Sequence, residues 1–440
     1  MTKTLRIIFI TISVLLLNIP SVAQEAVDSL STDSITADTI EVDTKLPWEQ
    51  QLSHSIDKML EEKMLQTSEV GIMVWDLTAD SCLYRYQERQ RMRPASTMKA
   101  VTAITALDAL GESYKLKTEL RYTGHIQEFT DMPEPSDSLE TPDSLKTQAH
   151  QAPPKKTLRG SLYIVGGMDP LFDDNDLKAF VNSVKALGVD SIIGGIYADR
   201  SFKDNKRYGN GWCWDDENPN LSALLLNKKD HLDDELRSRL RMAGIILLTS
   251  NTSATAPDNS ILLCRREHKL TDVMRPMMKH SDNLIAECVF YQIAHQQGGK
   301  DASASDARQR INRLIRNIGL NDDDYTIADG SGLSLYNYVS AELETLLLRY
   351  AYQHRNIYNA LLPTLPQAGI DGTLSSRMKG SKAHGNVQAK TGTVAGISSL
   401  TGYCTAANGH RLCFSIINQG IKGHKQARAF QDRLCNLLCR

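Results

Sequence analysis

The sequence predicts an α+β fold in which both ends of the chain build one antiparallel sheet. Two strand-like stretches occur early, at 68–80 and 82–90, and three occur late, at 385–393, 397–406 and 411–419. Helical spacing of apolar residues precedes the early pair and follows the late three. We therefore expect a single five-stranded antiparallel sheet flanked by helices, with the middle of the chain forming a separate excursion from it.

The N-terminus has the pattern of a signal peptide. Lys3 and Arg6 precede an apolar stretch at 7–17, and the small residues Ser21, Val22 and Ala23 follow it. We expect cleavage after Ala23, which makes residues 1–23 the signal and places the mature protein outside the cytoplasm, in the periplasm. A retained anchor is the alternative, but the apolar stretch is short of the roughly 20 residues that span a bilayer. No integral membrane segment is expected after cleavage.

The composition of the whole chain indicates a globular protein and argues against a nucleic-acid partner. The chain has 440 residues, enough for two or three domains, and a formal net charge of −2. No run of Lys or Arg forms a stripe that would neutralise a phosphate backbone.

Changes in composition along the chain predict its domain organisation. Residues 24–45 are acidic and rich in Ser and Thr, which predicts a disordered linker. We assign the main domain to 46–114 and 266–440, and an inserted β-rich domain to 115–265. The inserted part has short β-like runs and one helix at 174–188, and its acidic, proline-containing stretch at 126–156 predicts a mobile loop.

Eight cysteines are scattered along the chain and do not form the dense framework of a small disulfide scaffold. Cys404 and Cys413 lie on consecutive predicted strands and are candidates to approach each other. Cys435 and Cys439 share one face of the last predicted helix. The pairing cannot be deduced from the sequence.

Three short motifs occur in a fixed order. Ser96 and Lys99 are three residues apart at the start of an apolar helix, so they share one face of its first turn. Ser281-Asp-Asn283 and Lys390-Thr-Gly392 follow, and average usage would place each tripeptide in roughly one chain in ten. Chance is a poor explanation for all three motifs together.

Ser-x-x-Lys alone is weak evidence, because the chain also has it at Ser55/Lys58 and Ser376/Lys379. The first of these lies inside an amphipathic helix, and the second lies in a polar stretch before the Lys390 strand. Only Ser96 follows a proline and opens a helix, where the N-terminus supplies positive potential and unpaired N–H groups. We therefore select Ser96 as the candidate nucleophile.

The three motifs resemble those of penicillin-binding proteins and class A β-lactamases. The resemblance implies that Ser96 attacks a carbonyl carbon of the substrate and becomes acylated. It also implies that Lys99 is the base that accepts the Ser96 hydroxyl proton. Lys99 can act so only if its pKa falls by about 3 units, which burial beside a second cation such as Lys390 would supply.

The resemblance also assigns roles to the other motif residues. Ser281 would relay a proton to the leaving amine, Asn283 would bind the substrate amide, and Asp282 would orient the turn. Lys390, assisted by Thr391, would attract a terminal carboxylate, and Gly392 would let the acyl chain lie close to the strand. The N–H groups of Ser96 and Thr393 would form the oxyanion hole.

Longer stretches narrow the resemblance to one family. "YIVGGMDPLF", "GWCWDDENPN", "MMKHSDNLIAE", "IADGSGLSLYN", "LPQAGIDGTL" and "AKTGT" are similar to the D-alanyl-D-alanine carboxypeptidase/endopeptidase family of the penicillin-binding protein 4 type, the class C low-molecular-mass penicillin-binding proteins. This implies a β-lactamase/transpeptidase-like domain with an inserted β-rich domain. The implied function is cleavage of peptidoglycan stem peptides and cross-links, with β-lactams as covalent inhibitors.

Two positions bear on substrate recognition in that family. Asp169 matches an aspartate that lines the cleft near the diaminopimelate side chain, although an Asp-Pro turn residue is an equal interpretation. Leu335 stands where the family usually has arginine, so a cation for that side chain's carboxylate is missing.

Other functions remain open at this point. A β-lactamase is the rival enzyme, but the Glu-x-x-Leu-Asn stretch that supplies its deacylating base is absent. A non-catalytic cell-wall binding module on the same fold is the second rival. Trp212 and Trp214 are interpreted as packing between domains rather than stacking on glycan, and His280 is disfavoured as a base beside Ser281. No metal or nucleotide motif is present, so no cofactor is expected.

Overall fold

The computed structural model describes residues 46–129, 155–212, 218–249 and 252–440. The predicted signal peptide at 1–23, the linker at 24–45 and Trp214 lie outside the described residues. Within the described part of the chain, no helix has the length and apolar character needed to cross a membrane.

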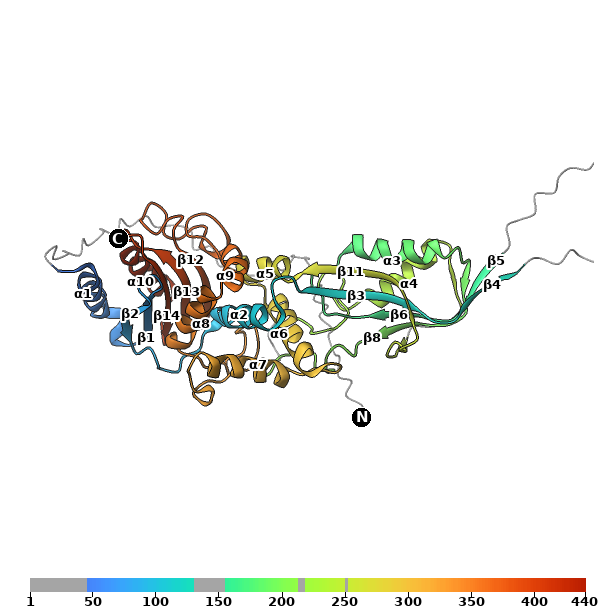
Figure 1. Cartoon of the computed structure of the whole chain (residues 1–440), viewed down its shortest axis with the longest axis horizontal. Helices are drawn as coiled ribbons and strands as arrows, with labels where there is room; N and C mark the ends of the chain where they lie inside the picture. The colour runs from blue at the N-terminus through green and yellow to red at the C-terminus, as the bar shows by residue number, and fades with distance from the viewer. Residues whose placement is uncertain (1–45, 130–154, 213–217, 250–251) are drawn as a thin grey trace, which may run out of the picture. The chain divides into compact units, whose positions relative to one another are not determined.

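The main sheet confirms the predicted antiparallel architecture. Five strands lie in the order β12-β13-β14-β1-β2, all antiparallel, so the late strands join the early pair through β14 and β1 (Figure 1). The strand bounds are β1 Glu69–Asp76, β2 Ser81–Tyr86, β12 Gln388–Val394, β13 Ile397–Thr405 and β14 Arg411–Gln419. Strand β12, which carries the Lys390 motif, is an edge strand.

Helices cover both faces of this sheet. On one face, the Tyr403 hydroxyl of β13 donates to the carbonyl of Leu348 in α8, Ala341–Gln353. On the other face, Gln431 of α10, His424–Leu438, donates to the Ser398 hydroxyl. Side chains alternate along a strand, which is why residues 398 and 403 contact different helices. Helix α1, Trp48–Leu60, packs against α10.

A buried helical layer carries the first two motifs. Helix α2, Met98–Leu110, has ten consecutive buried residues, as expected of a helix that is apolar on all sides. Its neighbours are α8 and the helices α5 Leu270–Lys279, α6 Asn283–Gly298, α7 Ala304–Asn317 and α9 Arg355–Leu361. The short 3₁₀ helices are η1 Lys63–Gln66, η2 Ala95–Thr97, η3 Asp322–Asp324, η4 Leu362–Thr364 and η5 Gly372–Leu374.

The middle region contains two further sheets, in the orders β10-β8-β6-β3-β11 and β4-β5-β7-β9. One apolar core joins them, because Leu120 and Ile164 of the first sheet cluster with Leu158 and Ile192 of the second. The bounds are β3 Lys115–Tyr122, β4 His125–Phe129, β5 Lys155–Arg159, β6 Leu162–Val165, β7 Ser191–Ile192, β8 Ile196–Asp199, β9 Ile246–Leu247, β10 Thr252–Ser253, β11 Ile261–Lys269, α3 Asp174–Ala186 and α4 Leu232–Met242.

The structure adds detail to two expectations for this region. The predicted loop at 126–156 is strand at both ends, because β4 pairs with β5 and Glu128 forms an ion pair with Lys156. Residues 130–154 lie outside the described residues. The predicted helix at 174–188 is confirmed as α3, and the region also contains α4, which the sequence analysis did not predict. Strand β11 stays paired with β3 as far as Lys269, past the assigned boundary at 265, and the domain boundaries remain a prediction.

The cysteine pair considered from the sequence does not meet. In the register of β13 and β14, Cys404 lies opposite Leu412 and Cys413 lies opposite Tyr403, so the two thiols point to different faces. Cys404 instead lies near Cys439, the residue that follows α10 (His424–Leu438), and this neighbour and burial raise the pKa of the Cys404 thiol. All cysteines of the described residues are free thiols.

Candidate functional site

Ser96 lies on a strained turn that leads into α2. Its neighbour Ala95 has a φ of +50°, in the left-handed region that residues with a Cβ rarely adopt. The Thr97 hydroxyl closes the turn by donating to the Pro94 carbonyl at 2.8 Å. Ser96 is partly exposed, whereas the helix behind it is buried. A strained residue held beside a polar side chain is common at functional sites.

The other two Ser-x-x-Lys matches have no comparable surroundings. Ser55 is buried in α1 while Lys58 points to solvent, and Ser376 and Lys379 are both exposed. Neither lysine is desolvated, so neither has the environment of Lys99.

Lys99 is fully buried and its amine lies among three polar atoms. The Nζ atom is 2.9 Å from Ser96 Oγ, 2.7 Å from Asn283 Oδ1 and 2.8 Å from the Ser331 carbonyl oxygen. An amide oxygen and a carbonyl oxygen only accept hydrogen bonds. A neutral amine therefore directs its two N–H groups to Asn283 and Ser331, which leaves its lone pair for the Ser96 hydroxyl.

The environment of Lys99 favours that neutral form. Burial lowers the pKa of Lys99 to about 8, against the opposing negative charges of Asp329, Glu287 and Asp282. Burial thus supplies the decrease in the Lys99 pKa that the sequence analysis required. Lys390 lies close enough for the charge of Lys99 to lower the Lys390 pKa as well, and this repulsion disfavours charging both amines at once.

The turn between α5 and α6 places the second motif. Ser281 has a φ of +59°, and Asp282 caps α6 by accepting from the Ile285 N–H at 2.9 Å. Asn283 is the first residue of α6, so its side chain reaches Lys99 from the helix start. Asp282 orients the turn, as the sequence indicated.

Lys390 forms a second buried lysine–serine pair. Its Nζ atom lies 2.9 Å from Ser281 Oγ and 2.7 Å from the Thr391 carbonyl. Burial, and after it the charge of Lys99, hold the pKa of Lys390 well below its usual range. The structure thus brings together Ser96, Lys99, Ser281, Asn283 and Lys390, the five residues that the motifs predicted for catalysis.

The rest of the third motif divides between the two faces of β12. Gly392 packs toward the Ser96 turn, where an added Cβ would lie 2.1 Å from Ser399 Oγ and 2.7 Å from the Pro94 carbonyl oxygen. Thr391 and Thr393 alternate to the other face. Thr391 Oγ1 donates to Thr373 Oγ1 at 2.8 Å, and Thr393 is exposed. Contact between these residues and a substrate remains a prediction.

We expect Gly392→Ala to lower the free energy of unfolding by about 1–3 kcal/mol, because the new methyl group overpacks the contact between β12 and the Ser96 turn. Urea denaturation measures the change. Gly423→Ala is the matched control, since no atom lies within 4 Å of a Cβ added there. Equal effects of the two substitutions would contradict this account of Gly392.

Sequence reasoning missed two buried carboxylates behind Lys99. Glu287 of α6 accepts from the N–H groups of Gly330 and Ser331, at 3.1 and 2.8 Å. Asp329 accepts from the Gly332 N–H. It also accepts from Nε1 of Trp212, a residue of the middle region, at 2.8 Å. The available signal was a glutamate inside the otherwise apolar run "LIAECVF".

Asp169 is enclosed rather than open to a cleft. Its side chain is 0% exposed, with Oδ2 at 2.6 Å from His268 Nδ1 and Oδ1 accepting from the Leu171 N–H. The structure does not join it to the five motif residues by a hydrogen bond, and the predicted substrate contact stays a prediction. Leu335 is exposed, and its carbonyl accepts from Arg93.

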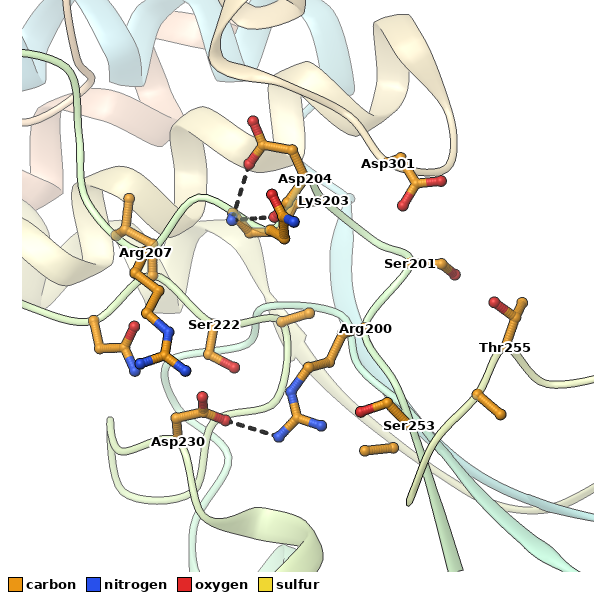
Figure 2. Close-up of a pocket in the computed structure, with 16 residues that line it drawn as sticks. Arg200, Ser201, Lys203, Asp204, Arg207, Ser222, Asp230, Ser253, Thr255 and Asp301 are labelled. Atoms are coloured by element: carbon orange, nitrogen blue, oxygen red, sulfur yellow. Dashed lines mark hydrogen bonds and ion pairs between the residues drawn. The ribbon is translucent and has the colours of Figure 1, made fainter. Parts of the chain in front are cut away.

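A separate pocket of about 660 Å³ lies at the ends of β8 and β10 (Figure 2). Arg200 there pairs with Asp230, and Lys203 pairs with Asp204. None of the predicted site residues lines this pocket.

The chain matches one family model and is similar to D-alanyl-D-alanine carboxypeptidases of other organisms. The model of the "D-Ala-D-Ala carboxypeptidase 3 (S13) family" matches residues 52–132, 138–225 and 220–440. The chain is 26% identical over 470 residues to a D-alanyl-D-alanine carboxypeptidase of Actinomadura sp. (strain R39), covering 85% of this chain and 82% of that protein. It is 23% identical over 440 residues to D-alanyl-D-alanine carboxypeptidase DacB of Haemophilus influenzae, covering 81% and 86%.

Solved structures confirm the predicted fold. Penicillin binding protein 4 from Haemophilus influenzae matches with a TM-score of 0.74 at 21% identity, over 88% of this chain and 99% of that one. The Bd3459 predatory endopeptidase from Bdellovibrio bacteriovorus matches with a TM-score of 0.52 at 16% identity, over 84% and 93%. With a family model that spans nearly all of the chain after residue 51, the chain belongs to the D-Ala-D-Ala carboxypeptidase 3 (S13) family of serine peptidases.

Proposed function

We propose that the protein is a D-alanyl-D-alanine carboxypeptidase/endopeptidase that forms an acyl-enzyme at Ser96. The observation that carries this is the 2.9 Å contact between Lys99 Nζ and Ser96 Oγ, made by an amine whose other two neighbours only accept hydrogen bonds. Lys99 takes the hydroxyl proton as Ser96 attacks the carbonyl carbon of the penultimate D-alanine. The acyl group then passes to water.

The second lysine–serine pair serves the leaving group and the substrate terminus. Ser281 relays the proton to the departing amine, supported by Lys390 at 2.9 Å. When the terminal carboxylate of a substrate binds near Lys390, its negative charge favours the protonated form of the Lys390 amine. Asn283 donates to the substrate amide, and the N–H groups of Ser96 and Thr393 stabilise the oxyanion.

The substrates proposed are peptidoglycan stem peptides and their cross-links, met outside the cytoplasm after removal of the signal at 1–23. Support comes from family membership and from the names of the relatives, which are D-alanyl-D-alanine carboxypeptidases. A β-lactam places a strained amide carbonyl at the same nucleophile, so penicillins are expected to acylate Ser96. One solved relative at 22% identity is described in complex with a β-lactam.

Labelling with a fluorescent penicillin tests the function. Wild type should form a long-lived covalent adduct, because the sequence lacks the Glu-x-x-Leu-Asn stretch that supplies the deacylating base of class A β-lactamases, and Ser96→Ala should form none. Rapid turnover of the label would instead indicate a β-lactamase, and no labelling of either protein would indicate a binding module. Digestion of purified uncross-linked and cross-linked muropeptides then distinguishes carboxypeptidase from endopeptidase activity, and intact D-alanine bonds in both would overturn the proposal.

A further inference from the structure

The carboxyl group of Glu287 is built into the structure behind the candidate base. Glu287 is 1% exposed and lies one helical turn after Asn283 on α6. Its Oε1 accepts from two successive amides, Gly330 at 3.1 Å and Ser331 at 2.8 Å. A buried acceptor of two amides fixes the path of the chain there, because either N–H left unpaired would cost free energy.

That segment of chain is the one that contacts Lys99. The Ser331 carbonyl accepts from Lys99 Nζ at 2.8 Å, and the next amide, of Gly332, donates to Asp329 at 2.7 Å. The Gly330 carbonyl accepts from Thr102 of α2 at 2.7 Å. The carbonyl that holds the Lys99 amine is therefore positioned by α2 and by two carboxylates, one of which lies on α6.

The charges that face Lys99 come from several elements. Asp282 and Glu287 act from α6 and its cap, Asp329 acts from the turn, and Lys390 lies on β12. Burial, and after it the Asp329 carboxylate, raise the pKa of Glu287 to about 8, close to that of Lys99. Two groups that interact and titrate in the same range lose their protons as a pair.

Glu287 also borders a pocket of about 440 Å³ that is lined by residues of α6, of α7 and of the segment at 206–210. The residues that line this pocket with it include Tyr291, Arg308, Lys206, Tyr208 and Asp329. Among the groups that act on Glu287, Lys99 favours the ionised carboxylate and Asp329 opposes it.

We propose that Glu287 is a positioning residue for acylation, which holds the Ser331 carbonyl against Lys99 and whose charge opposes deprotonation of the Lys99 amine. It touches neither substrate nor Ser96 and acts through the turn at 330–332. The inference rests on the proposed function, because it takes Lys99 as the base of an acylation step.

The test measures the second-order rate constant of acylation by a fluorescent penicillin from about pH 6 to about pH 9.5. In Glu287→Gln, the amide oxygen still accepts from both N–H groups but the charge is removed. We expect the midpoint of the acid limb, where Lys99 loses its proton, to fall by about 0.5–1 pH unit because the neighbouring negative charge is gone. In Glu287→Ala, both amides lose their acceptor, and the rate constant should fall at least about tenfold at every pH.

Asp199→Asn is the matched control, because Asp199 is also a buried carboxyl group but accepts from Ser201 and Ala256 in the middle region rather than from the turn at 330–332. Its acid limb should keep the wild-type midpoint. An unchanged midpoint in Glu287→Gln, or wild-type acylation in Glu287→Ala, overturns the inference while leaving the proposed function intact. Failure of wild type to be acylated would instead overturn the proposed function.

Discussion

Replacing Lys99 with methionine is expected to lower the rate constant of acylation by a penicillin roughly 10²–10⁴-fold, the usual contribution of a positioned general base. Ser96 would remain in place, but the hydroxyl proton would have no acceptor. Titration with a fluorescent penicillin and gel quantification measures the loss. Methionine is the informative replacement because its unbranched side chain fills nearly the same buried volume.

The same substitution should change stability far less than activity. Loss of the hydrogen bonds to Asn283 and Ser331 costs free energy, but removal of a fully desolvated amine offsets part of that cost. We expect the free energy of unfolding to change by no more than about 2 kcal/mol. A variant that is inactive and folded separates the role of the base from a role in packing.

Lys203→Met is the matched control for Lys99→Met. Lys203 is also buried, with its side chain 2% exposed, and its amine donates to the carbonyls of Asp204 and Lys206 in the middle region. We expect a loss of stability of about 1–3 kcal/mol with acylation preserved. If both variants lost acylation equally, Lys99 would have no special role.

The elements that sequence could predict are those with strong local patterns. The two early and three late strands of the main sheet alternate or run apolar, and their pairing follows from chain topology. The middle region was harder, because β7, β9 and β10 are only two residues long and depend on tertiary pairing rather than on propensity. Helix α4 was missed although Leu232, Leu236 and Leu240 share one buried face.

The catalytic motifs were predictable, whereas their support was not. The spacing and order of the motifs identify Ser96, Lys99 and Lys390, since each motif is a short local run. Glu287 and Asp329 act on Lys99 through backbone amides of a turn that is distant in sequence from α2. Such long-range contacts produce no periodic pattern of residue types in the sequence. Only a charged residue within an apolar run hints that a buried partner exists.

Asp329→Ala should be the most destabilising single substitution that we predict, by about 3–5 kcal/mol, because it leaves several buried donors without an acceptor. The Asp329 side chain is buried and accepts from five groups: the Gly332 N–H, the Ser334 N–H, Asn337 Nδ2, Trp212 Nε1 and the Ser331 hydroxyl. Asp329→Asn should rescue little, since its amide N–H groups would face other donors. Urea denaturation, with the exposed Asp323→Ala as control, measures the difference. A loss below about 1 kcal/mol for Asp329→Ala would mean that water or a rearranged turn satisfies those donors, and acylation should then survive as well.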